Sequence, residues 1–283
     1  MEDWHEKIHS GGRMKMKSLE IVKHLKIYRQ FIKMSVMQQL EYRVNFIMGF
    51  LGECVYLFSK MLYVMIVYRA GGNISGLSPD QLILFIGTFT IMTAIFVGLF
   101  LNNFFGISRE ILKGELDVFI VKPISLQFFV TTRFVDIVKP IPNVIAGTAL
   151  IVIGWSRLGA STGITHILSY IAFMICGTVL AYSLFLIPQI LAFWTIKTGG
   201  GNDITSRLWD FNNMPMKIYN KWMQRIGVFV VPVFVITNFP VMAVINDLSI
   251  YYRIWGVAIS IFMFVCARLL WNIAIKQYSS AGG

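Results

Sequence analysis

Six long apolar stretches, separated by short polar segments, dominate the chain. They cover about residues 44–68, 79–103, 139–157, 164–195, 226–246 and 250–270. Because an α-helix rises 1.5 Å per residue, about 20 apolar residues cross the roughly 30 Å hydrocarbon core of a bilayer. The pattern therefore predicts an all-α integral membrane protein, with a single domain of six transmembrane helices over residues 43–283.

A different pattern precedes the first stretch. In residues 18–42 apolar side chains recur near helical spacing, and lysines and arginines recur between them. This predicts an amphipathic helix that lies at the membrane surface, with an ordinary soluble amphipathic helix as the alternative. Residues 1–17 are polar and are expected to form a separate N-terminal extension.

The ends of two stretches carry local signals. Ser78 is followed by Pro79 and, three residues after the serine, by Gln81, which predicts a capping box with proline at the first helical position. The 164–195 stretch has no charged residue and is longer than a bilayer requires. We expect it to tilt, to kink near Pro188 or to project into the cytoplasm.

The composition agrees with a membrane protein, and the charge distribution sets its orientation. The chain is 56% hydrophobic and 14% charged, with a mean hydropathy of +0.67 and a net charge of +11; soluble domains carry about 25% charged residues. If both termini are cytoplasmic, all but four of the 25 lysines and arginines lie on the inner side, the exceptions being Lys60, Arg69, Arg157 and Arg253. The positive-inside rule explains this bias without nucleic-acid binding.

Patterns typical of enzymes are weak or missing. Residues 5–9 read His-Glu-Lys-Ile-His, the spacing of a zinc-protease helix, but no third ligand lies nearby in the sequence and we interpret the match as accidental. No phosphate-binding loop occurs, so the chain is not expected to hydrolyse ATP itself. The three cysteines, Cys54, Cys176 and Cys266, lie in apolar stretches and are expected to be buried thiols. We expect no catalytic residues, metal site or cofactor on this chain.

Two ionisable residues interrupt the first apolar stretch. Glu53 and Lys60 are seven residues apart, which places them two helical turns apart on one face. Such residues are costly in a membrane, and they usually line a pathway or pair between helices. The alternatives are a protonated or hydrogen-bonded Glu53 and a Lys60 that reaches the outer headgroups. An ion or proton site at Glu53 would make the protein a secondary transporter or a channel.

The polar segment after the second stretch predicts a short amphipathic helix. In residues 109–125 an apolar stripe and a charged stripe recur at helical spacing. The apolar stripe is Leu112, Leu116, Phe119 and Ile120, and the charged stripe is Glu110, Lys113 and Asp117. Gly114 permits a bend or a close approach, and Pro123 forces a corner after Lys122. A plain interfacial loop helix is the alternative. Further on, Arg133, Asp136 and Lys139 are spaced for an ion-pair ladder on one helix.

The same segment resembles a known family. The string Arg109-x-x-x-x-Gly114-x-Leu116-Asp117-x-x-x-x-Lys122-Pro123 is similar to the first cytoplasmic loop of bacterial type-2 ABC exporter permeases with six helices and unassigned substrates. The string Tyr42-Arg43-x-Asn45-Phe46 and the ending QYSSAGG, residues 277–283, are similar to the same family.

This resemblance implies a function and partners. A cytoplasmic coupling helix, by position Ile107–Phe119, would dock on a separate ABC ATPase subunit that holds ATP and Mg²⁺. The coupling residues would be Arg109, Glu110, Lys113, Gly114, Glu115, Leu116, Asp117, Lys122 and Pro123. The family also implies a second permease chain, identical or related, in the plasma membrane of a bacterium. A hydrophobic or amphipathic substrate is expected, together with an outer gate where prolines break the fifth span.

Overall fold

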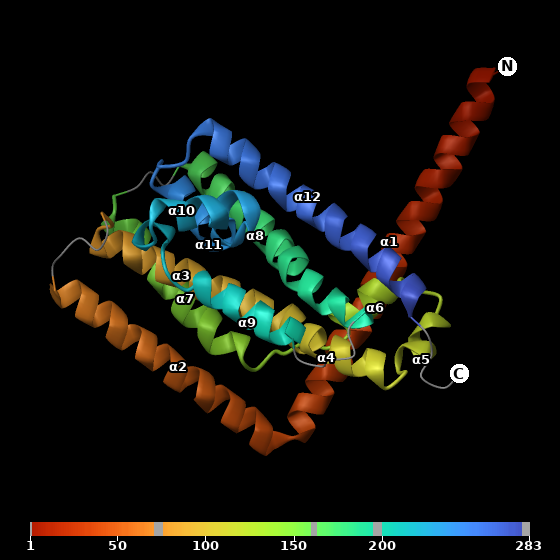
Figure 1. Ribbon diagram of the computed structural model, residues 1–283, viewed down its shortest axis with the longest axis horizontal. Helices are drawn as coiled ribbons and strands as arrows, with labels where there is room; N and C mark the ends of the chain where they lie inside the picture. The colour runs from red at the N-terminus through yellow and green to blue at the C-terminus, as the bar shows by residue number, and fades with distance from the viewer. Residues whose placement is uncertain (1, 71–75, 160–162, 195–199, 279–283) are drawn as a thin grey trace.

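The computed structural model describes residues 2–70, 76–159, 163–194 and 200–278 (Figure 1). It is all-helical, as predicted, with 85% of the residues in helices. The helices are α1 Glu2–Glu41, α2 Arg43–Ala70, α3 Pro79–Phe96, α4 Asn102–Leu112, α5 Leu116–Ile120, α6 Leu126–Thr132, α7 Pro140–Arg157, α8 Ile164–Ile190, α9 Gly200–Phe211, α10 Lys221–Arg225, α11 Val233–Val244 and α12 Ile250–Ala274.

The first two helices form an arm beside the bundle. α1 runs without a break from Glu2 to Glu41, so the helix expected over 18–42 continues through the segment expected to be a separate extension. Its first half projects away from the other helices, and α2 returns along one side of the bundle (Figure 1). The direction changes at Tyr42, the single residue between the two helices.

Small residues bring the central helices into backbone contact. A Cβ atom on Gly154 of α7 would lie 2.7 Å from the backbone nitrogen of Leu84 in α3. A Cβ on Gly177 of α8 would lie 2.5 Å from the carbonyl oxygen of Ile236 in α11. Helices in membranes gain stability mainly from such close packing, because lipid removes the hydrophobic drive between them. The α3–α7 and α8–α11 pairs therefore form the core.

Within the described residues, three helical runs are long and apolar enough to cross a membrane. They are Pro79–Leu112, in which a π-helical turn joins α3 to α4, Ile164–Phe193 and Ile250–Gln277. A bent pair, Lys221–Val230 with Val233–Val244, raises the number to four if it is one span. The capping box at Ser78 and Gln81 is confirmed, with Pro79 at the start of α3. α8 contains Pro188 two residues before its end and passes into a 3₁₀ turn, Leu191–Phe193.

The fifth apolar stretch, 226–246, is broken, as its prolines indicated. The chain bends by 100° between Val230 and Val233. Lys217, before the bent pair, donates to the carboxylate of Asp247, after it, at 2.8 Å. A segment whose two ends are joined in this way enters and leaves the bundle at the same end. That end also holds the start of α3, because Lys217 lines a small pocket with Leu77.

The hydropathy pattern predicted that the bent pair would cross the bundle after α8. In the structure α9 runs through the bundle there instead. A Cβ on Gly201, in its first turn, would lie 2.7 Å from the carbonyl oxygen of Pro188 near the end of α8. From there α9 runs back along α3 (Figure 1). Its Trp209 stacks on Phe96, with ring centroids 4.8 Å apart, and also contacts Phe89 at 5.7 Å. The basic residues Lys217, Lys221 and Arg225 were expected on the same side of the membrane as residues 107–119. They follow α9 and therefore lie at the opposite end of the bundle.

Candidate functional site

The segment between α4 and α6 is a rigid bend. α4 ends at Leu112, and Gly114 takes a left-handed φ of +69° that side chains other than glycine rarely adopt. The backbone N–H of Glu115 donates to the carbonyl of Glu110 at 3.0 Å, and that of Gly114 to the carbonyl of Ile111 at 3.2 Å. These two bonds form a Schellman motif, which ends a helix. The helix expected at Ile107–Phe119 is therefore interrupted at Gly114, where the sequence allowed a bend.

The break divides the predicted apolar stripe between buried and exposed positions. Leu116 of α5 is fully buried in the core, whereas Leu112 and Ile120 are largely exposed. The members of the predicted coupling set that are exposed are Arg109, Lys113, Asp117, Lys122 and Pro123. We call the four charged members the bend surface. Gly114 and Glu115 are half-buried at the turn itself.

Glu110 does not belong to that surface. Its side chain is only 1% exposed and forms an ion pair with Arg133, whose side chain is 13% exposed. The Arg133 guanidinium lies 4.5 Å from the ring centroid of Phe119 and 4.6 Å from that of Phe134. The expectation that Glu110 is available to a partner is wrong, because its carboxylate is paired within the fold and holds α4 against the end of α6.

Of the predicted ladder of Arg133, Asp136 and Lys139, the Asp136–Lys139 pair forms and the Arg133–Asp136 pair does not. Arg133 is the C-cap of α6 and turns toward Glu110, and the residues after it are not helical. Asp136 and Lys139 do approach each other, with 3.7 Å between the carboxylate and the ammonium. Asp136 also accepts from the backbone N–H groups of Val138 and Lys139, at 3.1 and 3.3 Å, and so leads the chain into α7.

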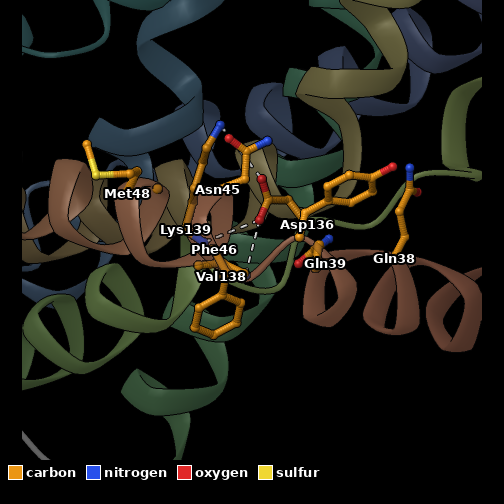
Figure 2. A pocket seen from close by; sticks show the side chains of 10 residues that line it. Gln38, Gln39, Asn45, Phe46, Met48, Asp136, Val138 and Lys139 are labelled. Atoms are coloured by element: carbon orange, nitrogen blue, oxygen red, sulfur yellow. Dashed lines mark hydrogen bonds and ion pairs between the residues drawn. The ribbon is translucent and has the colours of Figure 1, made fainter.

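Two side chains of α1 form hydrogen bonds with the segment that connects α6 to α7. Gln39 uses both ends of its amide: the nitrogen donates to the carbonyl of Val135 at 2.7 Å, and the oxygen accepts from the N–H of Ile137 at 3.1 Å. Ser35, one turn earlier, accepts from the N–H of Val135 at 3.1 Å. Gln39, Asp136 and Lys139 all line one pocket of about 520 Å³ (Figure 2).

α6 is also fixed to the long helices of the bundle. Gln127 accepts a hydrogen bond from Arg268 of α12 at 2.6 Å and donates to the hydroxyl of Tyr182 in α8 at 3.1 Å. Beyond α12, Tyr278 lies beside Asp117 of the bend, and burial together with this carboxylate raises the pKa of the tyrosine hydroxyl. The bend is thus connected to α1, α8 and α12 at the same end of the molecule.

The two charged residues in the interior of α2, Glu53 and Lys60, have different partners. The Glu53 carboxylate accepts a hydrogen bond from the side-chain amide of Asn143 in α7 at 2.8 Å. Lys60 instead lies over the ring of Phe89 in α3, with 3.8 Å between its nitrogen and the ring centroid. The side chains share a face of α2, but they are held by different neighbours.

Comparison with known proteins identifies the family. The family model described as "ABC-2 family transporter protein" matches residues 54–282, which is most of the chain. The chain belongs to the ABC-2 transporter family. It is therefore a multi-pass membrane protein and the permease component of an ABC transporter, not itself a catalyst, and its family implies association with ABC ATPase subunits. No curated protein and no solved structure gives a match.

Two features of this permease were missed at the sequence level. The pairing of Glu110 with Arg133 joins residues 23 positions apart, and no spacing rule connects them. Ser35 and Gln39 were also missed, although their four-residue spacing on the same side of α1 was a usable signal. No group of three or more metal-binding side chains occurs in the described part of the permease, and residues 5–9 lie where side chains are not described.

Proposed function

We propose that this permease is half of the membrane pathway of an ATP-driven exporter, and that its bend surface docks on a separate ABC ATPase. The bend supports this proposal because it presents charged side chains at one end of the bundle while its own backbone is fixed by the Schellman motif. A rigid projection transmits force better than a flexible loop does.

The contacts around the bend supply a route for that force. A displacement of α4 acts on Arg133 through Glu110, and on α7 through the irregular segment that follows. Gln127 passes a displacement of α6 to α8 and α12, and Gln39 passes it to α1. Closure of an ATPase dimer would then rotate several long helices together, which is a common form of switching transition.

The topology that we propose has six crossings, formed by α2, α3 with α4, α7, α8, α9 and α12, with both termini in the cytoplasm. α9 has 12 residues and covers only about 18 Å, so the chain after it completes the fifth crossing. α10 and α11 then form a hairpin that enters and leaves on the outer side, in place of the gate expected within one broken span. The basic bias of the remaining cytoplasmic segments supports this orientation.

The exposed face of α2 supports a further partner. Apolar side chains such as Val55 and Phe58 are more than half exposed, which suits contact with lipid or with a second permease chain. We propose that two permease chains, identical or related, enclose one pathway in a bacterial plasma membrane. ATP and Mg²⁺ would be bound by the ATPase subunits. The substrate expected is hydrophobic or amphipathic.

The alternative, a secondary transporter or channel with an ion site at Glu53, has less support. The amide of Asn143 donates to the Glu53 carboxylate, which favours a clamp between α2 and α7. An ion site would make transport independent of ATP, strongly dependent on pH and absent in Glu53→Gln. An exporter with a structural Glu53 predicts none of these three results.

The proposal is tested by reversing charge on the bend surface. In the double variant Arg109→Glu, Lys113→Glu, we expect the amount of ABC ATPase that copurifies with the permease to fall about tenfold, because like or mismatched charges weaken docking. The matched control is Lys221→Glu, an exposed lysine of α10 at the other end. Equal ATPase recovery from the double variant and the control would contradict the proposed docking surface.

A further inference from the structure

Lys60 faces a partly open cavity that is lined by three parts of the chain. Besides Phe89, its ammonium lies 4.8 Å from the ring centroid of Tyr56 and 3.4 Å from the side-chain oxygen of Asn213, just after α9. The cavity has a volume of about 240 Å³, and its remaining walls are Ser59, Ile86 and Met214. It therefore combines one cation and three polar side chains, those of Tyr56, Ser59 and Asn213, with an apolar surface.

The charge of Lys60 is only partly compensated. The described residues contain three ion pairs, and Lys60 takes part in none of them. Glu53, on the same helix, is bonded to Asn143, and Asp210 of α9 is exposed. Aromatic faces and one amide oxygen attract an ammonium group more weakly than a carboxylate does when water is limited.

The cavity adjoins the interior of α3 and not its first turn. Phe89 follows Pro79, the first residue of α3, by ten positions, or about 15 Å along the helix axis. This is about half of the roughly 30 Å hydrocarbon core. Lys and Arg side chains at such depth usually face a wet cavity and mark the path of a substrate or an ion.

We propose that this cavity binds the anionic group of an amphipathic molecule, with Lys60 as its counter-ion. A phosphate, sulfate or carboxylate would accept hydrogen bonds from the ammonium group, and the adjacent apolar part would lie against Phe89 and Met214. The volume fits a head group, and it is smaller than the 300–1,000 Å³ typical of sites that enclose a drug-sized ligand. The inference rests on the proposed exporter function, to which it adds that the cargo carries negative charge.

The test uses the permease alone in phosphatidylcholine nanodiscs, without ATPase or nucleotide. Decyl phosphate and decyltrimethylammonium have the same alkyl chain and opposite charge, and their affinities are measured by calorimetry. We expect saturable binding of decyl phosphate only, weakened about tenfold in Lys60→Gln and retained within about threefold in Lys60→Arg, because a charge-assisted bond is lost in the first variant alone. Lys221→Gln, which changes the same charge at an exposed site, should bind as the wild type does.

A second measurement needs no variant. In wild-type permease, decyl phosphate should slow acetylation of the Lys60 ammonium, detected by mass spectrometry, whereas decyltrimethylammonium should not. Unchanged affinity in Lys60→Gln, absence of protection, or equal binding of both amphiphiles would overturn the proposal. Because no ATPase is present, these results are independent of whether the bend surface docks on an ATPase, and failure of the docking test would leave them interpretable.

Discussion

The ion pair between Glu110 and Arg133 gives a quantitative prediction. Removing one partner of a buried pair leaves the other charge without compensation, which typically destabilises a protein by about 3–5 kcal/mol. Glu110 is almost fully buried, but Arg133 is 13% exposed and keeps its contacts with two aromatic rings. We therefore expect Glu110→Leu to lower the free energy of unfolding by about 3 kcal/mol, near the lower limit.

The magnitude is tested with a double-mutant cycle. Arg133→Met alone should also be destabilising, by about 3 kcal/mol or more, because it leaves the Glu110 carboxylate unpaired in the more buried position. The double variant replaces both charges with apolar side chains and should recover most of the loss. Free energies would be measured by reversible unfolding of the intact permease in mixed micelles. The assignment of a coupled buried pair would be refuted if each single variant lost less than about 1 kcal/mol of unfolding free energy. It would also be refuted if the loss in the double variant equalled the sum of the two single losses.

Two further predictions concern stability. Gln39→Ala removes two hydrogen bonds to the segment before α7 and should lower the free energy of unfolding by about 1–3 kcal/mol. The same change at its exposed neighbour, Gln38→Ala, should have little effect. Equal effects of the two variants in a thermal-shift assay would contradict the attachment of α1 to this segment. Gly154→Ala places a Cβ 2.7 Å from the backbone of Leu84 and should cost about 1–3 kcal/mol. Gly49→Ala, where no atom lies within 4 Å, is its control, and a tolerated Gly154→Ala would contradict close α3–α7 packing.

The features that the sequence predicted correctly depend on residues close together in the chain. The all-helical fold follows from long apolar stretches, and the start of α3 follows from Ser78, Pro79 and Gln81, whose interactions are confined to one turn. Gly114 was recognised as a bend or a close approach, but the apolar stripe favoured a continuous helix. The structure shows that the positive φ of Gly114 ends α4, and that burial of Leu116 depends on the change of direction.

Longer-range features could not be predicted in the same way. The charged residues of α9 suggested a cytoplasmic segment, although Trp209 packs against α3 deep in the bundle. Prolines indicated that the next apolar stretch was broken, but only the contact between Lys217 and Asp247 shows that its ends meet. Hydropathy records how apolar a segment is; it does not record which end of the bundle each residue reaches.

Photocrosslinking from the bend surface tests the central claim most directly. A photoreactive residue would replace Lys113 in the permease purified with its ABC ATPase from native membranes, and a second variant would carry it in place of Lys221. We expect crosslinks to the ATPase from position 113 and none from position 221. Crosslinks to the ATPase from position 221, or none from position 113 in a complex that still hydrolyses ATP, would contradict the account.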